Sequence, residues 1–274
     1  MAVTLADITH LRKMCGAGMM DCKKALEEAG NDFDKAMEII RKKGQVVAAK
    51  RSDRDASEGC VLAADNGDFA AIVAVKCETD FVAKNADFVA MTQSFLDLAM
   101  ANKPASNEEF LAMTFNDGRT VENYITDRIG MTGEKMELGC YEFVKDVYTI
   151  SYIHHGNKLS TIVSFNKPFE RQVAREIAMQ VAAMNPVAIT PTDVSQKVID
   201  TELEIARDKA RQAGKPEKML DMIAQGALQK FYKESTLLQQ EFIKDAQLTI
   251  DQYLRKQDKD LTVTSFKRVT LNVD

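Results

Sequence analysis

Two stretches of this chain follow the same order of elements, and the repetition constrains the fold more than any other sequence feature. Each has two apolar runs joined by a polar turn, then a short exit, then an amphipathic segment closed by Asn and Pro. Apolar runs bounded by turn residues predict β-hairpins, and the 3.6-residue periodicity that follows predicts a helix. The hairpins are expected at 60–77 and 148–165, and the helices begin near Ala86 and at Asn166.

Antiparallel hairpins that each precede a helix predict an α+β fold with a duplicated, two-part α/β core of antiparallel strands. Shorter periodic segments supply the remaining parts of this core. We expect helices at 106–114, at 120–129 ending at Gly130, and at about 246–255, with strands at 137–144 and 261–273.

The N-terminal residues, 1 to about 45, show helical periodicity in three short segments. Asp7 is the candidate N-cap of the first helix, and Asn31 or Asp32 caps the third. Gly44 is expected to end the third helix, because glycine commonly follows the last helical residue. Three helices of this size predict a small module that binds rather than catalyses.

Three parts are therefore predicted. They are the helical module and its linker at 1–54, the first core half at 55–145, and the second core half at 146–274. The second half also contains two long helical segments joined at Gly214-Lys215-Pro216. This pattern predicts an inserted antiparallel helical hairpin at about 192–233.

Composition narrows the class of function. The chain has 274 residues with net charge −5, so it shows no overall footprint for direct nucleic-acid binding. No apolar run approaches the roughly 18 residues of a membrane helix, and the N-terminus has no signal-peptide pattern. We expect a cytoplasmic protein without a membrane partner. Residues 41–54 are a local exception, with six cations against Asp53 alone. They fit either a solvated helix end and linker or a contact for an acidic protein surface.

The cysteines argue for a reduced protein without a metal or cofactor. Five widely spaced cysteines contain no Cys-x-x-Cys pair, and Cys15 and Cys22 with His10 match no zinc spacing. An enzyme that uses His154 or His155 with Cys77 rests on residue types alone. A protein without covalent chemistry of its own is therefore expected.

The exit of the first hairpin carries an unusual string, residues 77–84, after the buried apolar run 70–75. The pattern alone allows Asp80 to cap a helical turn while Phe81 packs inward. It also allows Phe81 to point outward from a rigid strand end. The second stretch has no counterpart of this motif at its exit, which weakens the view that the motif only closes the fold.

Two strings are specific enough to identify a relationship. Residues 16–26, Gly-Ala-Gly-Met-Met-Asp-Cys-Lys-Lys-Ala-Leu, and residues 79–84, Thr-Asp-Phe-Val-Ala-Lys, resemble the bacterial elongation factor Ts family in sequence, order and separation. The resemblance covers nearly the whole chain. It implies that the N-terminal module is ubiquitin-associated-like. It also implies a guanine-nucleotide exchange factor that binds elongation factor Tu·GDP and promotes GDP release during translation elongation.

The resemblance also implies a set of contact residues. In the motif Thr79-Asp80-Phe81-Val82, Asp80 and Phe81 are expected to enter the partner's nucleotide domain. There the aromatic ring would wedge between partner helices near the magnesium and phosphate site.

Further contacts are implied at His155, at the pair Ile129 and Gly130, and at Lys23. His155 is chosen over His154 because Gly156 follows it. The helical hairpin is expected to reach another domain of the partner, and a higher assembly of the two factors is possible. The small module by itself would instead suggest an adaptor for ubiquitin-like proteins, which would leave the core and hairpin without a role.

Overall fold

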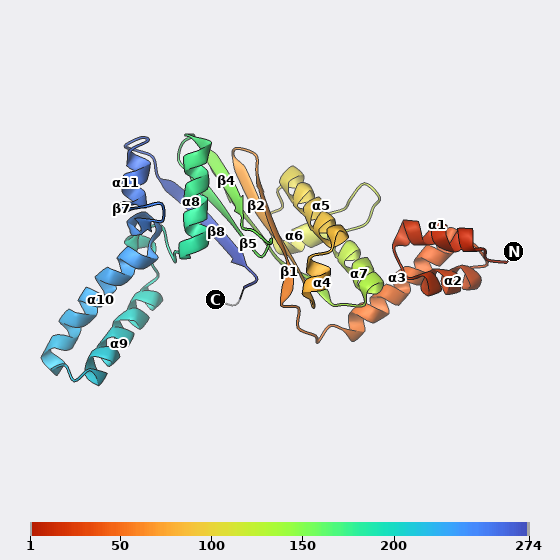
Figure 1. The fold of residues 1–274 in the computed structure, drawn as a ribbon, viewed down its shortest axis with the longest axis horizontal. Helices are drawn as coiled ribbons and strands as arrows, with labels where there is room; N and C mark the ends of the chain where they lie inside the picture. Colours follow the sequence, from red (N-terminus) through yellow and green to blue (C-terminus); the bar gives the residue numbers. More distant parts are fainter. Residues whose placement is uncertain (1, 273–274) are drawn as a thin grey trace.

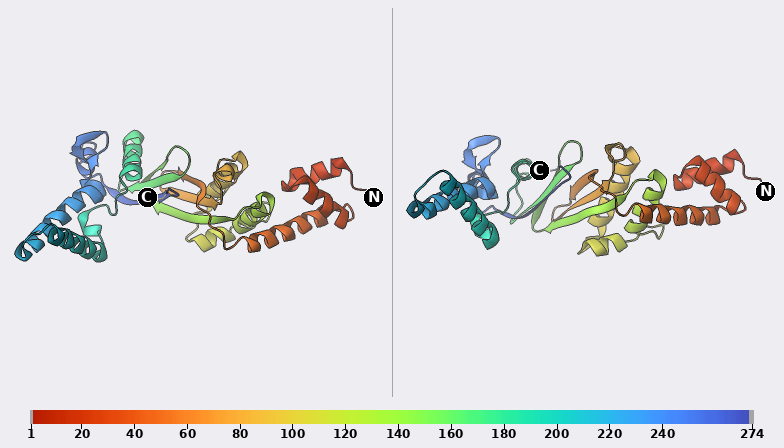
Figure 2. Two further views of the ribbon diagram at one scale, coloured as in Figure 1. Left: turned by 60° about the horizontal axis from the view of Figure 1, so that its bottom comes forward. Right: turned by 90° about the horizontal axis from the view of Figure 1, so that it is seen from below.

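The computed structural model describes residues 2–272 as an elongated molecule with helices at both ends of a central pair of sheets (Figures 1 and 2). The N-terminal end is formed by α1 (Leu5–Cys15), α2 (Met19–Glu28) and α3 (Phe33–Lys50). These helices enclose a small core of their own that includes Leu11, Leu26 and Ala36. Thr4 caps α1, not Asp7 as predicted, because the Thr4 side chain accepts from the Asp7 N–H in a capping box.

Helix α3 begins after Asp32, as predicted, but the prediction that Gly44 ends it is wrong. Gly44 lies inside the helix, where it contacts Gly130 of α7 (Val121–Thr132). Gly130 likewise does not end its own helix, which continues to Thr132 before the left-handed Gly133. Both glycines permit a close approach of two helix backbones, so neither marks a helix end.

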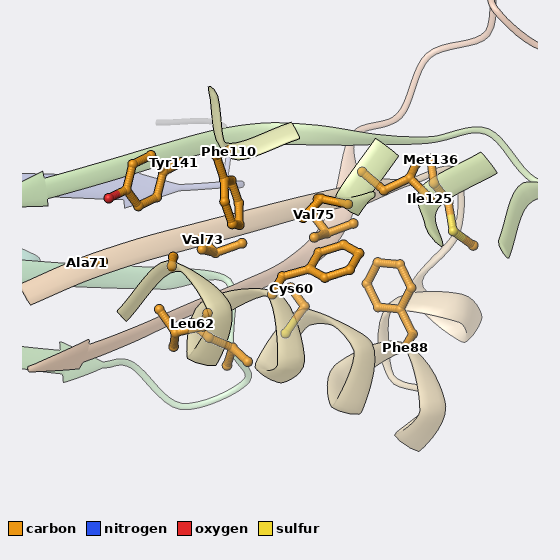
Figure 3. Packing of buried hydrophobic residues seen from close by; sticks show 14 of the residues in the cluster. Cys60, Leu62, Ala71, Val73, Val75, Phe88, Phe110, Ile125, Met136 and Tyr141 are labelled. Carbon is orange, nitrogen blue, oxygen red and sulfur yellow. The ribbon is translucent and has the colours of Figure 1, made fainter. Parts of the chain in front are cut away.

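The first sheet has the antiparallel strand order β1-β2-β3. Its hairpin is confirmed, and Gly67 takes the positive φ of 104° that the turn requires. Helix α5 covers one face, and Figure 3 shows Leu62, Val73 and Val75 of the sheet pointing into the same core as Phe88 of α5. The elements of this half are β1 (Glu58–Asp65), β2 (Phe69–Cys77), α4 (Asp80–Ala83), α5 (Ala86–Asn102), α6 (Asn107–Ala112), α7 and β3 (Met136–Lys145).

The second sheet has the order β4-β5-β8, so its second hairpin strand is also central. It comprises β4 (Tyr148–Ile153), β5 (Leu159–Phe165) and β8 (Val263–Thr270). Helix α8 (Arg171–Met184) covers its outer face through residues such as Ile177 and Val181. The helix starts at Arg171, a few residues later than predicted, because the backbone is still non-helical at its N-cap, Glu170, where ψ is 121°.

The two sheets pack against each other between α5 and α8 (Figure 1). Their contact is made of small and branched apolar side chains, including Val61, Ile72 and Ile162. Both faces of β1 and β2 are therefore buried, which explains why these strands read as continuous apolar runs. The α+β class is confirmed. The domain boundaries, the duplication and the ubiquitin-associated likeness stay predictions.

The other end of the molecule is the helical hairpin of α9 (Gln196–Gln212) and α10 (Leu220–Ser235) (Figures 1 and 2). It leaves and rejoins the core at one place, where Ala188 and Thr236 form a parallel bridge. The predicted helix at 246–255 is half wrong, since β7 (Asp245–Thr249) pairs with β6 (Glu241–Phe242) before α11 (Ile250–Arg255) begins. Within residues 2–272, no helix has the length and apolarity needed to cross a membrane.

Candidate functional site at the exit of strand β2

Helix α4 displays an aromatic side chain to solvent directly after a buried strand. Phe81 is 84% exposed, whereas Ala83 is 7% exposed and Val82 packs against the core of the first half. Successive residues of a helix turn by about 100°, so a single turn can bury one side and project the other. The interpretation that Phe81 packs inward is therefore wrong.

Thr79, not Asp80, caps this turn. The Thr79 hydroxyl oxygen accepts from the Val82 N–H at 3.4 Å. Thr79 in turn donates its N–H and its hydroxyl proton to the two carboxylate oxygens of Glu134, at 3.1 Å and 2.7 Å. Asp80 lies in the first turn and pairs with Lys84 Nζ at 2.6 Å. The hydrogen bond from Lys84 lowers the pKa of Asp80, which is therefore ionised at neutral pH.

A second carboxylate holds the strand exit from the other side. Glu78 accepts from the Lys135 N–H at 2.6 Å and from the guanidinium groups of Arg51 and Arg54 at 3.0 Å each. The Lys135 N–H and then the two arginines lower the pKa of Glu78 to about 2, against some desolvation. Three segments thus meet at the base of α4: the linker after α3, the exit of β2, and the loop between α7 and β3.

These contacts also bear on the basic run at 41–54. Arg51 and Arg54 neutralise an acid inside the molecule, and Lys42 pairs with Glu38 at 2.7 Å. Lys43 pairs with Asp21 of α2. Most of the run is therefore matched internally, which favours the solvated helix end and linker over an acidic protein surface.

The turn between β4 and β5 presents the two adjacent histidines. Both are exposed, and Nδ1 of His154 lies 3.0 Å from the Tyr152 hydroxyl. Within residues 2–272, the His155 side chain forms no hydrogen bond or ion pair. The turn is tied to the first half, because the Val61 N–H donates to the Asn157 carbonyl at 2.7 Å. Lys158 of this turn pairs with Glu58 at 2.7 Å, and Glu58 lies opposite Cys77, so the turn and α4 lie at the same end of the first sheet.

The other predicted contact residues lie elsewhere. Ile129 is 6% exposed and belongs to the first core, and Gly130 is packed against Gly44. Lys23 is half-exposed on α2 and pairs with Glu27 at 3.7 Å. Among the described residues, none of these three forms a hydrogen bond or an ion pair with α4. Their predicted contacts with a partner stay predictions.

Sequence reasoning missed the residues that hold α4. Glu78 directly precedes the motif, so its position was a usable signal. Glu134 is 55 positions from Thr79, and no local pattern connects the two. The loop that reaches α4 begins just after α7, three residues beyond the predicted Gly130.

The enzyme interpretation loses its candidate nucleophile. Cys77 is fully buried, and this burial raises the pKa of its thiol to about 12. Reactive cysteines have the opposite environment, exposed and electropositive, which lowers the pKa. In the part of the chain that the structure describes, no group of three or more His, Cys, Asp or Glu side chains could hold a metal ion.

Comparison with known proteins identifies the family of the chain. The family model described as Elongation factor TS matches residues 78–272, from the strand exit to the last described residue. The chain belongs to the elongation factor Ts family. Membership indicates a nucleotide exchange factor for elongation factor Tu in translation elongation.

Relatives named elongation factor Ts match over their full length. The protein of Porphyromonas gingivalis (strain W83) is 68% identical over 274 residues, with all of both chains covered. That of Azobacteroides pseudotrichonymphae is 54% identical over 275 residues, and that of Bacteroides thetaiotaomicron is 47% identical over 331, again with full coverage of both chains. An elongation factor Ts sequence thus accounts for the helical module as well as the core.

Proposed function

We propose that this elongation factor Ts binds elongation factor Tu·GDP and promotes GDP release by inserting Phe81 near the magnesium and phosphate site of the partner. Asp80 enters with it, and His155 assists from the second core half. The observation that carries the proposal is the 84% exposed Phe81 on a turn held by Glu134 and Glu78. A side chain with this exposure contributes little to the buried core, so its ring is available to a partner.

The energetics require more than Phe81. A nucleotide held at nanomolar affinity is bound by about 12 kcal/mol, whereas burial of one Phe contributes about 2–3 kcal/mol. The factor must bind the nucleotide-free partner better than the loaded one, and this coupling is reciprocal. The helical module, the core and the α9–α10 hairpin supply the breadth of interface, and Phe81 converts that binding energy into local distortion.

Asp80 and His155 act beside the aromatic ring. The ionised Asp80 carboxylate competes electrostatically with the contacts of magnesium or phosphate, while Lys84 keeps it oriented. Among the residues that the structure describes, the His155 side chain has no hydrogen-bond or ion-pair partner, so its ring is available to the nucleotide domain. Exchange of this kind involves no covalent chemistry in the factor. It belongs in the cytoplasm, with elongation factor Tu as partner and no direct contact to nucleic acid or membrane, and the two factors form a higher assembly.

The test is release of a fluorescent GDP analogue from elongation factor Tu at saturating factor. Phe81→Ala should slow the maximal release rate by roughly 30- to 150-fold, the factor that corresponds to burial of one Phe. The matched control is Val147→Ala. Val147 is 59% exposed in the turn after β3, and the pairing of Phe69 with Lys145 places that turn at the far end of the sheet from Cys77. The two ends are separated by roughly 26 Å of strand.

Val147→Ala should release GDP at the wild-type rate. If Phe81→Ala, folded and still bound to elongation factor Tu, does the same, the proposed role of the ring is wrong.

A further inference from the structure

The direction of Phe81 needs a source of rigidity outside α4. A helix of four residues cannot sustain itself, because nucleation of a helical turn is unfavourable in isolation. Val82 and Ala83 anchor one side of the turn in the core, but they do not fix its entry. The entry is Thr79, where the extended strand becomes a helix.

Glu134 fixes that entry with its whole carboxylate. One oxygen accepts the Thr79 N–H at 3.1 Å, and the other accepts the Thr79 hydroxyl proton at 2.7 Å. Within residues 2–272, the Glu134 side chain has no ion pair and no other hydrogen-bond partner. The bound hydroxyl also accepts from the Val82 N–H, so the carboxylate, the cap and the first turn of α4 form one chain of hydrogen bonds.

The loop that carries Glu134 is itself held. Gly133, at φ 72°, ends α7 and turns the chain, and the Glu134 N–H donates to the Thr132 hydroxyl at 3.2 Å. The next residue, Lys135, donates its N–H to Glu78 at 2.6 Å. The loop therefore gives a carboxylate to the strand exit and receives one from it, which prevents the two segments from sliding past each other.

We propose that Glu134 is a positioning residue for nucleotide exchange: it holds the strand exit so that Phe81 has one direction before the partner binds. The claim that Glu134 acts in exchange is the functional half of the proposal and rests on the proposed function. The claim that Glu134 fixes the direction of Phe81 is the mechanical half and does not. Glu134 is partly buried behind Thr79, and the broader interface supplies the affinity. Loss of the carboxylate therefore affects the rate of release at saturation more than the concentration needed for binding, because the ring must be ordered within the complex.

The mechanical half can be measured without the partner. The chain contains no tryptophan, so Phe81→Trp introduces a single indole at the tip of α4. Time-resolved fluorescence anisotropy of this variant reports the local motion of the side chain on its turn. Adding Glu134→Ala should enlarge the fast-motion amplitude, and Glu134→Gln, which keeps one acceptor oxygen, should give an intermediate value. Thr79→Val removes the hydroxyl that Glu134 binds and should act in the same direction.

The matched control is Glu137→Gln. Glu137 is also a carboxylate near the start of β3, and it pairs with Lys76 and Lys135 at 3.3 Å and 3.2 Å without touching Thr79. Its removal perturbs the charge of the same region and should leave the anisotropy unchanged. Circular dichroism and the melting temperature of every variant establish that the fold is retained.

The functional half is measured in the chain that keeps Phe81, without the Phe81→Trp substitution. Glu134→Ala removes both hydrogen bonds to Thr79 and should lower the maximal rate of GDP release by at least roughly tenfold, the smallest factor expected for loss of a single charge-assisted hydrogen bond. The half-saturating concentration of the factor should change by less than about twofold, because the contact surfaces that supply affinity remain. Glu137→Gln should change neither quantity. A fold defect would instead lower the active fraction and appear as a lower melting temperature.

Unchanged anisotropy in both Glu134→Ala and Thr79→Val would overturn the proposal at the mechanical level. Increased mobility with a wild-type release rate would overturn the positioning role in exchange. If Phe81→Ala itself releases GDP at the wild-type rate, the proposed role of the Phe81 ring in exchange is wrong. The anisotropy result then still decides whether Glu134 holds the turn.

Discussion

Gly44 and Gly130 determine where the helical module lies, although neither has a side chain. They occupy the interiors of α3 and α7, and a Cβ atom on Gly130 would lie 2.6 Å from the Gly44 Cα atom. That neighbour is backbone, which cannot rotate away as a side chain can. The pair therefore sets the separation of the two helices at their closest point.

A substitution at this crossing should cost stability. Gly130→Ala should lower the free energy of unfolding by about 1–3 kcal/mol, because overpacking displaces the helices. Gly226→Ala is the control, since nothing lies within 4 Å of a Cβ atom at that position of α10. It should raise stability by about 0.5–1 kcal/mol through helix propensity. Urea unfolding measures both, and equal stabilisation by the two changes would contradict the close crossing.

Glu78 should make the free energy of unfolding depend on pH in the acid range. Its pKa in the folded protein is about 2, below the ordinary value of 4.5. A carboxylate with a depressed pKa stabilises the fold above its unfolded pKa, and this contribution disappears as pH falls through the folded pKa. The difference in unfolding free energy between wild type and Glu78→Gln should be constant above pH 5 and shrink between pH 4.5 and 2. A difference that stays constant down to pH 3 would show that Glu78 is not held as described.

At the scale of elements, the sequence predicted what local chemistry controls. The first hairpin followed from two apolar runs around Asn66-Gly67, and Gly67 has the positive φ that such a turn needs. Both core helices followed from periodicity and from the Asn residues at their ends. Asn185 indeed takes the left-handed conformation after α8, whereas Lys103 takes it after α5.

The predictions that were wrong failed because of contacts between segments that are distant in the chain. Gly44 and Gly130 have the residue type of a helix stop, but their role depends on a partner 86 positions away. Residues 246–249 carry no strong strand signal, and they extend because β6 lies beside them. A single sequence cannot show these pairings, since each depends on a segment distant in the chain.

In the site, too, local sequence predicts some features, and contacts between distant residues decide the others. Asp80 and Phe81 came from resemblance to a family, since the pattern alone also allowed an inward Phe81. Glu134 could not be predicted, because it binds Thr79 across 55 positions. Only the strand and the turn that present the motif follow from local sequence.

At the scale of the molecule, the helical module and the α9–α10 hairpin lie at opposite ends, with α4 between them (Figure 1). This spread suits a division in which the ends supply affinity and the centre acts on the nucleotide. The hairpin is the easier end to test. Its two connections are adjacent, since the Leu237 N–H donates to the Ala188 carbonyl at 2.9 Å.

Replacing residues 192–233 with a short Gly-Ser linker should leave the core folded. The half-saturating concentration for GDP release should rise at least about tenfold, because contact area is lost. The maximal rate at saturation should stay within about twofold, since Phe81 and its supports remain. Fluorescent GDP release measures both values, and circular dichroism checks the core. A maximal rate that falls as far as that of Phe81→Ala would contradict the proposal that the hairpin supplies affinity while Phe81 distorts the nucleotide site.

The adjacent connections of the hairpin have a consequence for how such a protein can diverge. An insertion whose two ends already meet adds little closure entropy when it lengthens, because that cost grows only logarithmically with length. Helical turns can therefore be gained or lost beyond Ala188 and Thr236 while the sheets and their packing stay the same. The length of the hairpin can therefore vary among related sequences independently of the core that carries α4.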